Sequence, residues 1–282
     1  MMTTRNIEQL IKSHATSDGA GVAIQRVAGF NNKKFSPFLM LDELYAESKE
    51  GYIGGFPPHP HRGIETLTYM RQGHFQHKDH MGNVGELRSG GAQWMAAGRG
   101  VIHSEMPMME DGAMHGFQLW INQPAKNKMQ PAEYMNLPME ELTHVQNEQL
   151  GELSVIAGSA DLGRETVVGP LDKTGVPLSV MDWRAHQGQS IQLNTATSDQ
   201  VLVYVYAGSI ESNGQAIERG TMALFSLGEA LELSASVHSG ALILVGQPIN
   251  EPVVHYGPFV MNTMEEIEQT IEEYQKGLFE TY

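Results

Sequence analysis

The sequence contains no cysteine, so disulfide bonds, thiolate metal ligands and cysteine nucleophiles are all excluded. It also lacks the uncharged apolar run of about 18 residues that a membrane-spanning helix needs. The first residues lack the apolar segment of a secretory signal peptide. Together these absences predict a cytoplasmic protein with no membrane partner.

Positive charge is scarce as well. The chain has 18 Lys and Arg residues against 33 Asp and Glu residues, which gives a formal net charge of −15. A protein that binds a phosphate backbone needs clusters of Lys and Arg to displace counterions. Direct nucleic-acid binding is therefore not expected, whereas a protein partner stays open. The acidic balance by itself indicates solubility rather than a particular function.

Short alternating segments separated by glycine turns dominate the 282 residues, of which 30 are glycine. Segments 64–71 and 115–122 alternate in this way, and turns recur about every 8–12 residues, as in a sandwich or barrel. Segment 66–75 is repeated at 201–210 as a strand, a glycine turn and a second strand. The sequence therefore predicts an all-β protein of two tandem barrels.

The domain boundary is expected in segment 124–136, which is polar and contains two prolines. We therefore expect one domain at residues 1–136 and a second at residues 137–282. Residues 1–20 are polar and are expected to form a short helix or a loose arm.

The chain closes with a predicted helix of about residues 263–277, which ends the second domain. Thr263 and Glu266 fit a capping box, in which each side chain satisfies a free backbone N–H of the other residue. Apolar residues then recur on one face, so we expect this helix to pack on a barrel.

Two pairs of potential metal ligands stand out: His59 with His61, and His103 with Glu105. Side chains at i and i+2 of an extended strand point to the same face. Two such strands facing each other across a barrel would bring three imidazoles and one carboxylate to one point. Imidazole suits iron, nickel, copper or zinc, and the added carboxylate favours redox-capable iron. Four ligands on an octahedral ion leave two positions open for substrate, water or O2.

The second barrel lacks this set, because the repeat aligns Asn194, Ala196, Leu233 and Ala235 with the four candidate ligands. We therefore expect about one metal ion per chain, in the first barrel. His238 and His255 remain in the second half; isolated and unpaired in sequence, they are expected to be ordinary surface or core histidines.

Three further histidines, His74, His77 and His80, follow each other along a predicted hairpin. They allow a second metal site, but they straddle a turn, and a solvated hairpin is the favoured interpretation. Arg62 directly follows the first ligand pair and is interpreted as structural.

Several segments resemble the pirin family of the cupin superfamily. The segments that carry this resemblance are PHPHRGIETLTY (58–69), GRGVIHSEMP (98–107), HGFQLWINQP (115–124), PFLMLDE (37–43) and GPFVMN (257–262). Pirins have two cupin, jelly-roll-like barrels, with Fe(II) held in the N-terminal barrel by three His and one Glu. The resemblance therefore implies Fe(II) at His59, His61, His103 and Glu105; Mn, Ni, Zn, Cu and Co are the other divalent metals that such a site accepts.

Several pirins, bacterial ones included, are quercetin 2,3-dioxygenases. The resemblance thus implies a flavonol or related aromatic substrate, O2 as cosubstrate and release of CO. Glu105 would accept the proton of the flavonol hydroxyl, which makes it the candidate catalytic residue. Gln118 and Trp120 share one face of their strand, and Phe56 and His115 lie near the ligands in sequence. These last four residues form the expected substrate pocket.

Two other functions stay open. Animal pirins are described as nuclear transcription coregulators, so the resemblance also allows a metal-dependent, redox-sensing regulatory or protein-binding role without significant turnover. A redox-inert Zn or Mn cupin, such as an isomerase or a sugar-modifying enzyme, is the third interpretation. Elemental analysis and O2 consumption with quercetin would separate the three.

Overall fold

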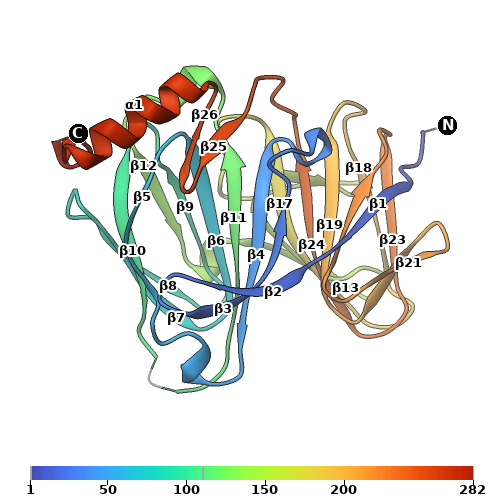
Figure 1. Cartoon of the computed structure of the whole chain (residues 1–282). Helices are drawn as coiled ribbons and strands as arrows, with labels where there is room; N and C mark the ends of the chain where they lie inside the picture. The colour runs from blue at the N-terminus through green and yellow to red at the C-terminus, as the bar shows by residue number, and fades with distance from the viewer. Residues whose placement is uncertain (1, 110, 282) are drawn as a thin grey trace. The chain divides into compact units, whose positions relative to one another are not determined.

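The computed structural model describes residues 2–109 and 111–281 and divides the chain into two compact units (Figure 1). The unit that carries the candidate ligands, here called the histidine unit, comprises His14–Asn31, Phe38–Glu140 and Ile249–Tyr282. The second unit comprises Met1–Ser13, Asn32–Pro37 and Glu141–Pro248. Each unit is therefore assembled from separate stretches of the chain.

These units differ from the expected division at residue 136. The first residues of the chain belong to the second unit, and the last stretch, with the C-terminal helix, belongs to the histidine unit. Long-range strand pairing and helix packing decide this membership, and composition along the chain does not reveal them.

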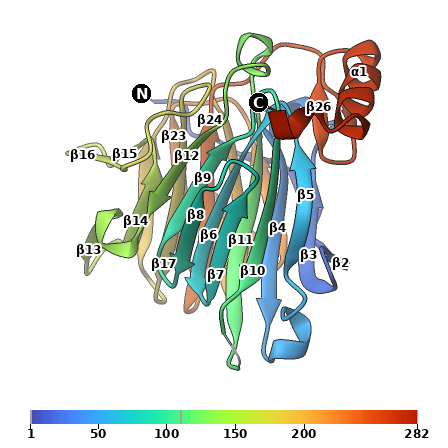
Figure 2. The same ribbon diagram turned by 90° about the vertical axis from the view of Figure 1, so that its left-hand side faces the viewer.

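The histidine unit contains two antiparallel sheets. Figure 2 shows β6, β11, β4 and β3 side by side in the larger sheet, whose strand order is β12-β9-β6-β11-β4-β3-β2. Its strands are β2(His14–Asp18), β3(Val22–Ala28), β4(Phe38–Ala46), β6(Ile64–Gln72), β9(Ala92–Ala96), β11(Met114–Asn122) and β12(Glu133–Leu137). The smaller sheet has the order β5-β10-β7-β8 and consists of β5(Phe56–His61), β10(Val101–Pro107), β7(His74–Asp79) and β8(Val84–Arg88). This smaller sheet carries all four candidate ligands.

A hairpin and a helix complete the histidine unit. The hairpin pairs β25(Val254–Tyr256) with β26(Phe259–Met261), and α1(Met264–Gln275) follows it. Thr263 and Glu266 form the predicted capping box, and Ile267 is buried beside Phe259 and Phe279. The prediction of a C-terminal helix is therefore confirmed. No helix among the described residues is both long and apolar enough to cross a membrane.

The second unit also contains two antiparallel sheets. Their strand orders are β1-β22-β19-β24-β17-β14-β13 and β16-β15-β18-β23-β20-β21. The strands of the first are β1(Ile7–Lys12), β13(Thr143–Asn147), β14(Gly151–Ala157), β17(Leu178–Ala185), β19(Gln200–Ala207), β22(Thr221–Phe225) and β24(Ser239–Gly246). The strands of the second are β15(Ser159–Asp161), β16(Thr166–Val168), β18(Ser190–Asn194), β20(Ser209–Ser212), β21(Gln215–Glu218) and β23(Ala230–Ala235). One continuous apolar cluster, which includes Leu233 and Ala235, fills this unit.

The described residues also form short 3-10 turns at Lys33–Phe35, Lys49–Gly51, Ala125–Asn127, Met139–Glu141 and Leu278–Thr281. Two local predictions were wrong. Residues 7–12 form edge strand β1, which pairs with β22, where a helix or loose arm was expected. Part of the expected linker forms β12, which pairs with β9. In both cases an available sheet edge satisfies backbone groups of a polar segment, and local sequence does not show where such an edge lies.

Candidate metal centre

The three candidate histidines lie on two neighbouring strands of the smaller sheet. His103 on β10 is directly opposite His59 on β5, and His61 is opposite Val101. The strands are hydrogen-bonded neighbours, whereas the sequence suggested strands facing each other across a barrel. The ring centroids are 4.4 Å apart for His59 and His103, 4.9 Å for His59 and His61, and 5.0 Å for His61 and His103. One potential ligand atom from each ring lies within 4.8 Å of the others.

The free nitrogens of this cluster suit a metal ion. His61 Nδ1 and His103 Nε2 are buried and have no hydrogen-bonding partner in the described part of the chain. His59 Nδ1 lies 2.9 Å from the carbonyl oxygen of Pro57, which leaves its other nitrogen available. Burial without a partner costs free energy that coordination to a metal would offset.

The protonation state of the cluster favours metal binding as well. Burial, and then the neighbouring His59, lower the pKa of His61 to about 3. Burial and the surrounding histidines lower the pKa of His103 well below its usual value. Both imidazoles are therefore neutral at pH 7, which is the form that coordinates a metal.

Glu105 lies next to this cluster but outside the group of three histidines. An irregularity in the strand pairing after His103 brings Glu105 opposite Phe56. The Glu105 carboxylate is buried, and its Oε1 accepts a hydrogen bond of 3.1 Å from the Thr68 hydroxyl. Burial raises the pKa of Glu105, an effect that His59 and the Thr68 hydrogen bond oppose.

Thr68 links Glu105 to the larger sheet. Its hydroxyl is 2.6 Å from Oε1 of Gln118, the residue directly opposite it on β11. The Thr68 hydroxyl has one proton and cannot donate to both partners. When the NH2 group of the Gln118 amide is oriented toward Thr68, the hydroxyl accepts from Gln118 and donates to Glu105. This arrangement gives a chain of hydrogen bonds from Gln118 through Thr68 to the carboxylate.

His77 lies beside the cluster, a position that the sequence did not predict. It is 3% exposed on β7, and its Nε2 lies 2.7 Å from His103 Nδ1. This contact fixes the His103 ring with Nε2 directed away from His77, free to coordinate. Burial lowers the pKa of His77 to about 4, so the ring is neutral and able to accept the proton of His103. The expected solvated hairpin is therefore wrong for His77, whose place on β7 opposite Glu105 buries it.

The other two histidines of that hairpin do not join a metal cluster among the described residues. His80 Nδ1 accepts a hydrogen bond of 3.1 Å from the Ile102 backbone, and His74 lies 3.3 Å from Glu86. His74 lies three residues before His77 on β7 and therefore faces the other side of the strand, whereas His80 lies in the turn after β7.

A cavity of about 610 Å³ opens onto the cluster, and its lining includes His59, His61 and Glu105. All of its lining residues belong to the histidine unit. This volume falls within the range of about 300–1,000 Å³ that is common for small-molecule sites.

Three of the four expected pocket residues line this cavity: Phe56, Gln118 and Trp120. His115 is not part of the lining; its Nε2 lies 2.9 Å from Glu43 Oε1. The physical reason is strand parity, because residue 115 faces the opposite side of β11 from residues 118 and 120.

The cavity also has lining residues that the sequence did not indicate. His255, expected to be an ordinary histidine, stacks on Phe30 with a centroid separation of 4.1 Å, and both line the cavity. Asp18, Arg26 and Asp42 line it too. Alternation of side chains along residues 22–28 places Arg26 on the same face of the strand as Ile24. Only the order of the strands in the sheet shows that this face lines the cavity.

Arg62 ties the ligand strand to the C-terminal helix. Its guanidinium is 1% exposed and donates from Nε to the Arg99 carbonyl at 2.6 Å. Its Nη1 lies 2.7 Å from Glu273 and 3.2 Å from the Thr270 hydroxyl, both on α1. The guanidinium carbon also lies 4.4 Å from the Phe279 ring centre. Arg62 is thus a structural residue, as predicted, and it joins the residue after His61 to α1.

Lys128 provides a second buried connection. Its Nζ donates to the carbonyl oxygens of Gly63 and Val260 and to Asn122 Oδ1, each at 2.8 Å. Gly63 has a positive φ of 77°, and a Cβ there would lie 2.1 Å from the Val260 oxygen, so this close approach requires glycine. Burial lowers the pKa of Lys128 to about 7, an effect that Glu251 and Glu266 oppose.

Comparisons with known proteins agree with this architecture. The family model named Pirin matches residues 21–121, and the model of the pirin C-terminal cupin domain matches residues 180–280. The fold is thus the two-domain cupin fold with a C-terminal helix, as predicted.

Two relatives resemble the chain over nearly its whole length. A Vibrio cholerae protein, provisionally named a quercetin 2,3-dioxygenase, is 60% identical over 282 residues and covers 100% of both chains. A Pseudomonas aeruginosa protein with the same provisional name is 43% identical and covers 99% of both chains.

A solved structure also matches closely. The crystal structure of a quercetin 2,3-dioxygenase from Acinetobacter baumannii has a TM-score of 0.91 and 32% identity, and the match covers 98% of each chain. With two family models and full-length relatives in agreement, this chain belongs to the pirin family.

Proposed function

We propose that this protein is an Fe(II)-dependent dioxygenase that cleaves the heterocycle of flavonols such as quercetin with O2 and releases CO. The observation that carries the proposal is the cavity, which opens onto the three clustered histidines and has a buried carboxylate and aromatic walls. The names of two relatives and of a matching structure support the same activity. In this reaction the ring carbon that bears the hydroxyl leaves as CO, and both atoms of O2 enter the remaining ester.

His59, His61, His103 and Glu105 are the residues that would hold the metal. Three imidazoles and a carboxylate suit iron, and the same donors accept Mn, Ni, Zn, Cu or Co. When bound, the metal supplies a positive charge that acidifies the flavonol hydroxyl and a redox centre for the reaction with O2.

Glu105 is the proposed general base for the flavonol hydroxyl. The carboxylate is buried and lines the cavity beside the histidine cluster, where a substrate hydroxyl would lie. Thr68 donates to Oε1 and holds the carboxylate in place. Phe56 and Trp120 supply apolar walls that suit a planar aromatic molecule and exclude water around the carboxylate.

The test is anaerobic purification with elemental analysis, followed by O2 consumption and CO release with quercetin. We expect about one iron per chain and turnover in proportion to the iron content. Alanine at His59, His61 or His103 should remove metal and turnover together, whereas His74→Ala, which alters a histidine outside the cluster, should leave both unchanged.

Two results would contradict the proposal. Metal-loaded protein that consumes no O2 with quercetin would favour the redox-sensing regulatory role instead. A stoichiometry near two, with an ion mapped to the second unit, would contradict a single metal centre per chain.

A further inference from the structure

A row of polar side chains crosses the wall of the cavity. Gln118 on β11 is directly opposite Asp42 on β4, and Asp42 is directly opposite Arg26 on β3. Paired residues of neighbouring strands share a face of the sheet. Strands are about 4.8 Å apart, so Arg26 lies two strand spacings, about 10 Å, from Gln118 and the hydrogen-bond chain to Glu105. The apolar residues Leu44 and Trp120 line the same cavity on either side of this row.

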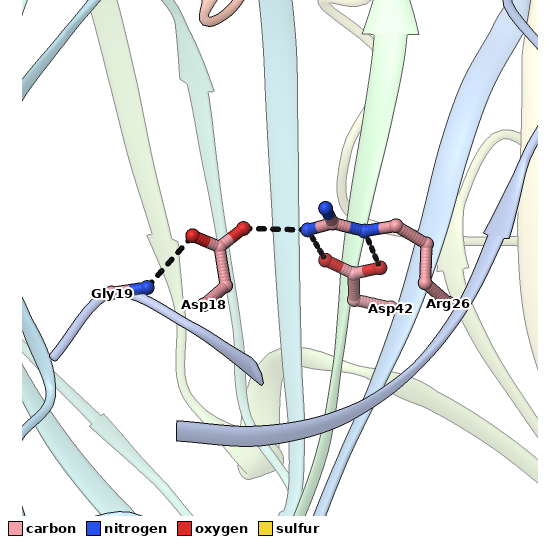
Figure 3. A network of polar contacts seen from close by, with 4 residues as sticks. All are labelled: Asp18, Gly19, Arg26 and Asp42. Atoms are coloured by element: carbon pink, nitrogen blue, oxygen red, sulfur yellow. Dashed lines mark hydrogen bonds and ion pairs between the residues drawn. The ribbon is translucent and has the colours of Figure 1, made fainter. Parts of the chain in front are cut away.

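Arg26 lies between two carboxylates at the end of the row (Figure 3). Its Nε and Nη2 donate to the two oxygens of Asp42 at 2.8 and 2.6 Å, and Nη2 also donates to Asp18 Oδ2 at 2.5 Å. Its third nitrogen, Nη1, donates to none of the residues that the structure describes. The guanidinium is therefore held in a fixed orientation and still has a free donor.

The two carboxylates differ in exposure to solvent. The Asp42 side chain is 6% exposed and bound by the fork of Arg26, whereas the Asp18 side chain, at the end of β2 and before a tight turn, is 49% exposed. That turn is nevertheless anchored beside the ligand strand, because Ala20 N donates to the Gly55 carbonyl at 2.9 Å. At Gly19 a Cβ would lie 2.5 Å from the same oxygen, so the turn packs too closely there for any larger residue.

The charge of this cluster indicates what it binds. One guanidinium and two carboxylates carry a net charge of −1, which disfavours an anionic ligand. A neutral hydroxyl suits it, because its oxygen accepts from Nη1 while its proton is donated to a free lone pair of Asp18 or Asp42. Hydrogen bonds to charged partners are stronger than those between neutral groups.

We propose that Asp18, Arg26 and Asp42 form a hydroxyl-recognition site that selects flavonols with a phenolic hydroxyl remote from their 3-hydroxyl and 4-carbonyl groups. This inference rests on the proposed function, since it takes the 3-hydroxyl and 4-carbonyl to lie at the histidine cluster. The remote hydroxyl then lies at the far end of the polar row. A flavonol without that hydroxyl leaves the Nη1 donor of Arg26 without an acceptor in the complex and binds more weakly.

The experiment measures dissociation constants by absorbance titration of the metal-loaded protein without O2, so that no turnover occurs. The ligands are 3-hydroxyflavone, its 7-hydroxy and 4′-hydroxy derivatives, and a derivative with a carboxylate in place of the remote hydroxyl. For the wild type we expect at least one hydroxy derivative to bind about ten- to a hundredfold more tightly than 3-hydroxyflavone. The carboxylate derivative should bind more weakly than that hydroxy derivative.

Variants test whether this preference arises from the cluster of Asp18, Arg26 and Asp42. Arg26→Gln should lose the preference for the hydroxy derivative while its affinity for 3-hydroxyflavone changes less than about threefold. Arg88→Gln is the matched control, because Arg88 also pairs with a carboxylate in this unit but is 67% exposed on β8. It should bind every ligand as the wild type does.

Asp18→Asn supplies an independent test that leaves the Arg26–Asp42 pair intact, and therefore holds even if Arg26→Gln unfolds. Removing one negative charge should tighten binding of the carboxylate derivative at least threefold. Equal affinities of the wild type for all the flavonols, or no effect of Asp18→Asn on the carboxylate derivative, would overturn the inference.

The two proposals fail in different ways. A hydroxyl preference without turnover in air would refute the dioxygenase and leave the recognition site standing. Turnover without any hydroxyl preference would refute the recognition site and leave the dioxygenase standing.

Discussion

The contact between His77 and His103 predicts how a residue that touches no metal controls metal affinity. To coordinate through Nε2, His103 must carry its proton on Nδ1, which lies 2.7 Å from His77 Nε2. In His77→Phe that proton would be buried without an acceptor whenever metal is bound. In the metal-free protein the proton can move to the other nitrogen, so the penalty falls on the metal-bound state.

The magnitude follows from the cost of an unsatisfied buried group, about 1–3 kcal/mol. Metal should therefore bind about 5- to 150-fold more weakly to His77→Phe, since each 1.4 kcal/mol is about tenfold. The loss overlaps the roughly 10- to 100-fold effect typical of residues that orient metal ligands. His77→Gln, whose amide oxygen can accept the proton, should recover part of the affinity.

The assay is competition with a chromophoric chelator for Fe(II) under anaerobic conditions, repeated with Zn(II) to avoid oxidation. His74→Phe is the matched control, because it alters a histidine of the same strand that does not contact His103. If His77→Phe binds both metals as tightly as the wild type, the orienting role of His77 is refuted.

Three further predictions concern other residues of the histidine unit. Glu105→Gln should keep part of its metal but lose about 10²–10⁴-fold in quercetin turnover per bound metal, since an amide cannot accept the proton; full activity per metal would remove Glu105 as the base. Arg62→Met should lower the free energy of unfolding by about 3–5 kcal/mol in urea denaturation, because it leaves buried partners unpaired, whereas the exposed Arg88→Met should change it little; equal effects would contradict the structural role of Arg62. The pKa of Lys128 is about 7 in the folded protein, against 10.5 for an ordinary solvated lysine. At pH values between these two, the unfolded chain therefore binds more protons than the folded protein does. The free energy of unfolding should therefore rise with pH across this window, by up to about 1.4 kcal/mol per pH unit, and Lys128→Met should remove that rise; parallel pH profiles would contradict it.

The clustering of the histidines was predictable because it depends on a local rule. Residues two apart on a strand share a face, and this alone aligned His59 with His61 and placed Gln118 with Trp120. The same rule, applied strictly, would have excluded His115 from that face. The capping box of α1 is equally local and was identified from Thr263 and its spacing to the following glutamate.

The remaining features of the site depend on which strands become neighbours. His77 is buried because β7 pairs with β10, and Arg26 faces the cavity because β3 lies beside β4. Neither pairing is encoded within a short segment. The place of His255 in the cavity lining could not be predicted either, because His255 is far from the ligands in sequence. It lines the cavity only because the last stretch of the chain belongs to the histidine unit.

The order of these stretches along the chain has a consequence for synthesis on the ribosome. The segment Ile249–Tyr282 emerges after the whole of Glu141–Pro248, which belongs to the other unit. At about 5–20 residues per second, completion of the histidine unit lags behind its own strands by on the order of ten seconds. During this interval the nascent β5 lacks the partners that Arg62 and Gly63 find in α1 and β26. Acquisition of the metal is therefore expected to follow release of the finished chain, and a nascent chain stalled before residue 249 should bind metal weakly.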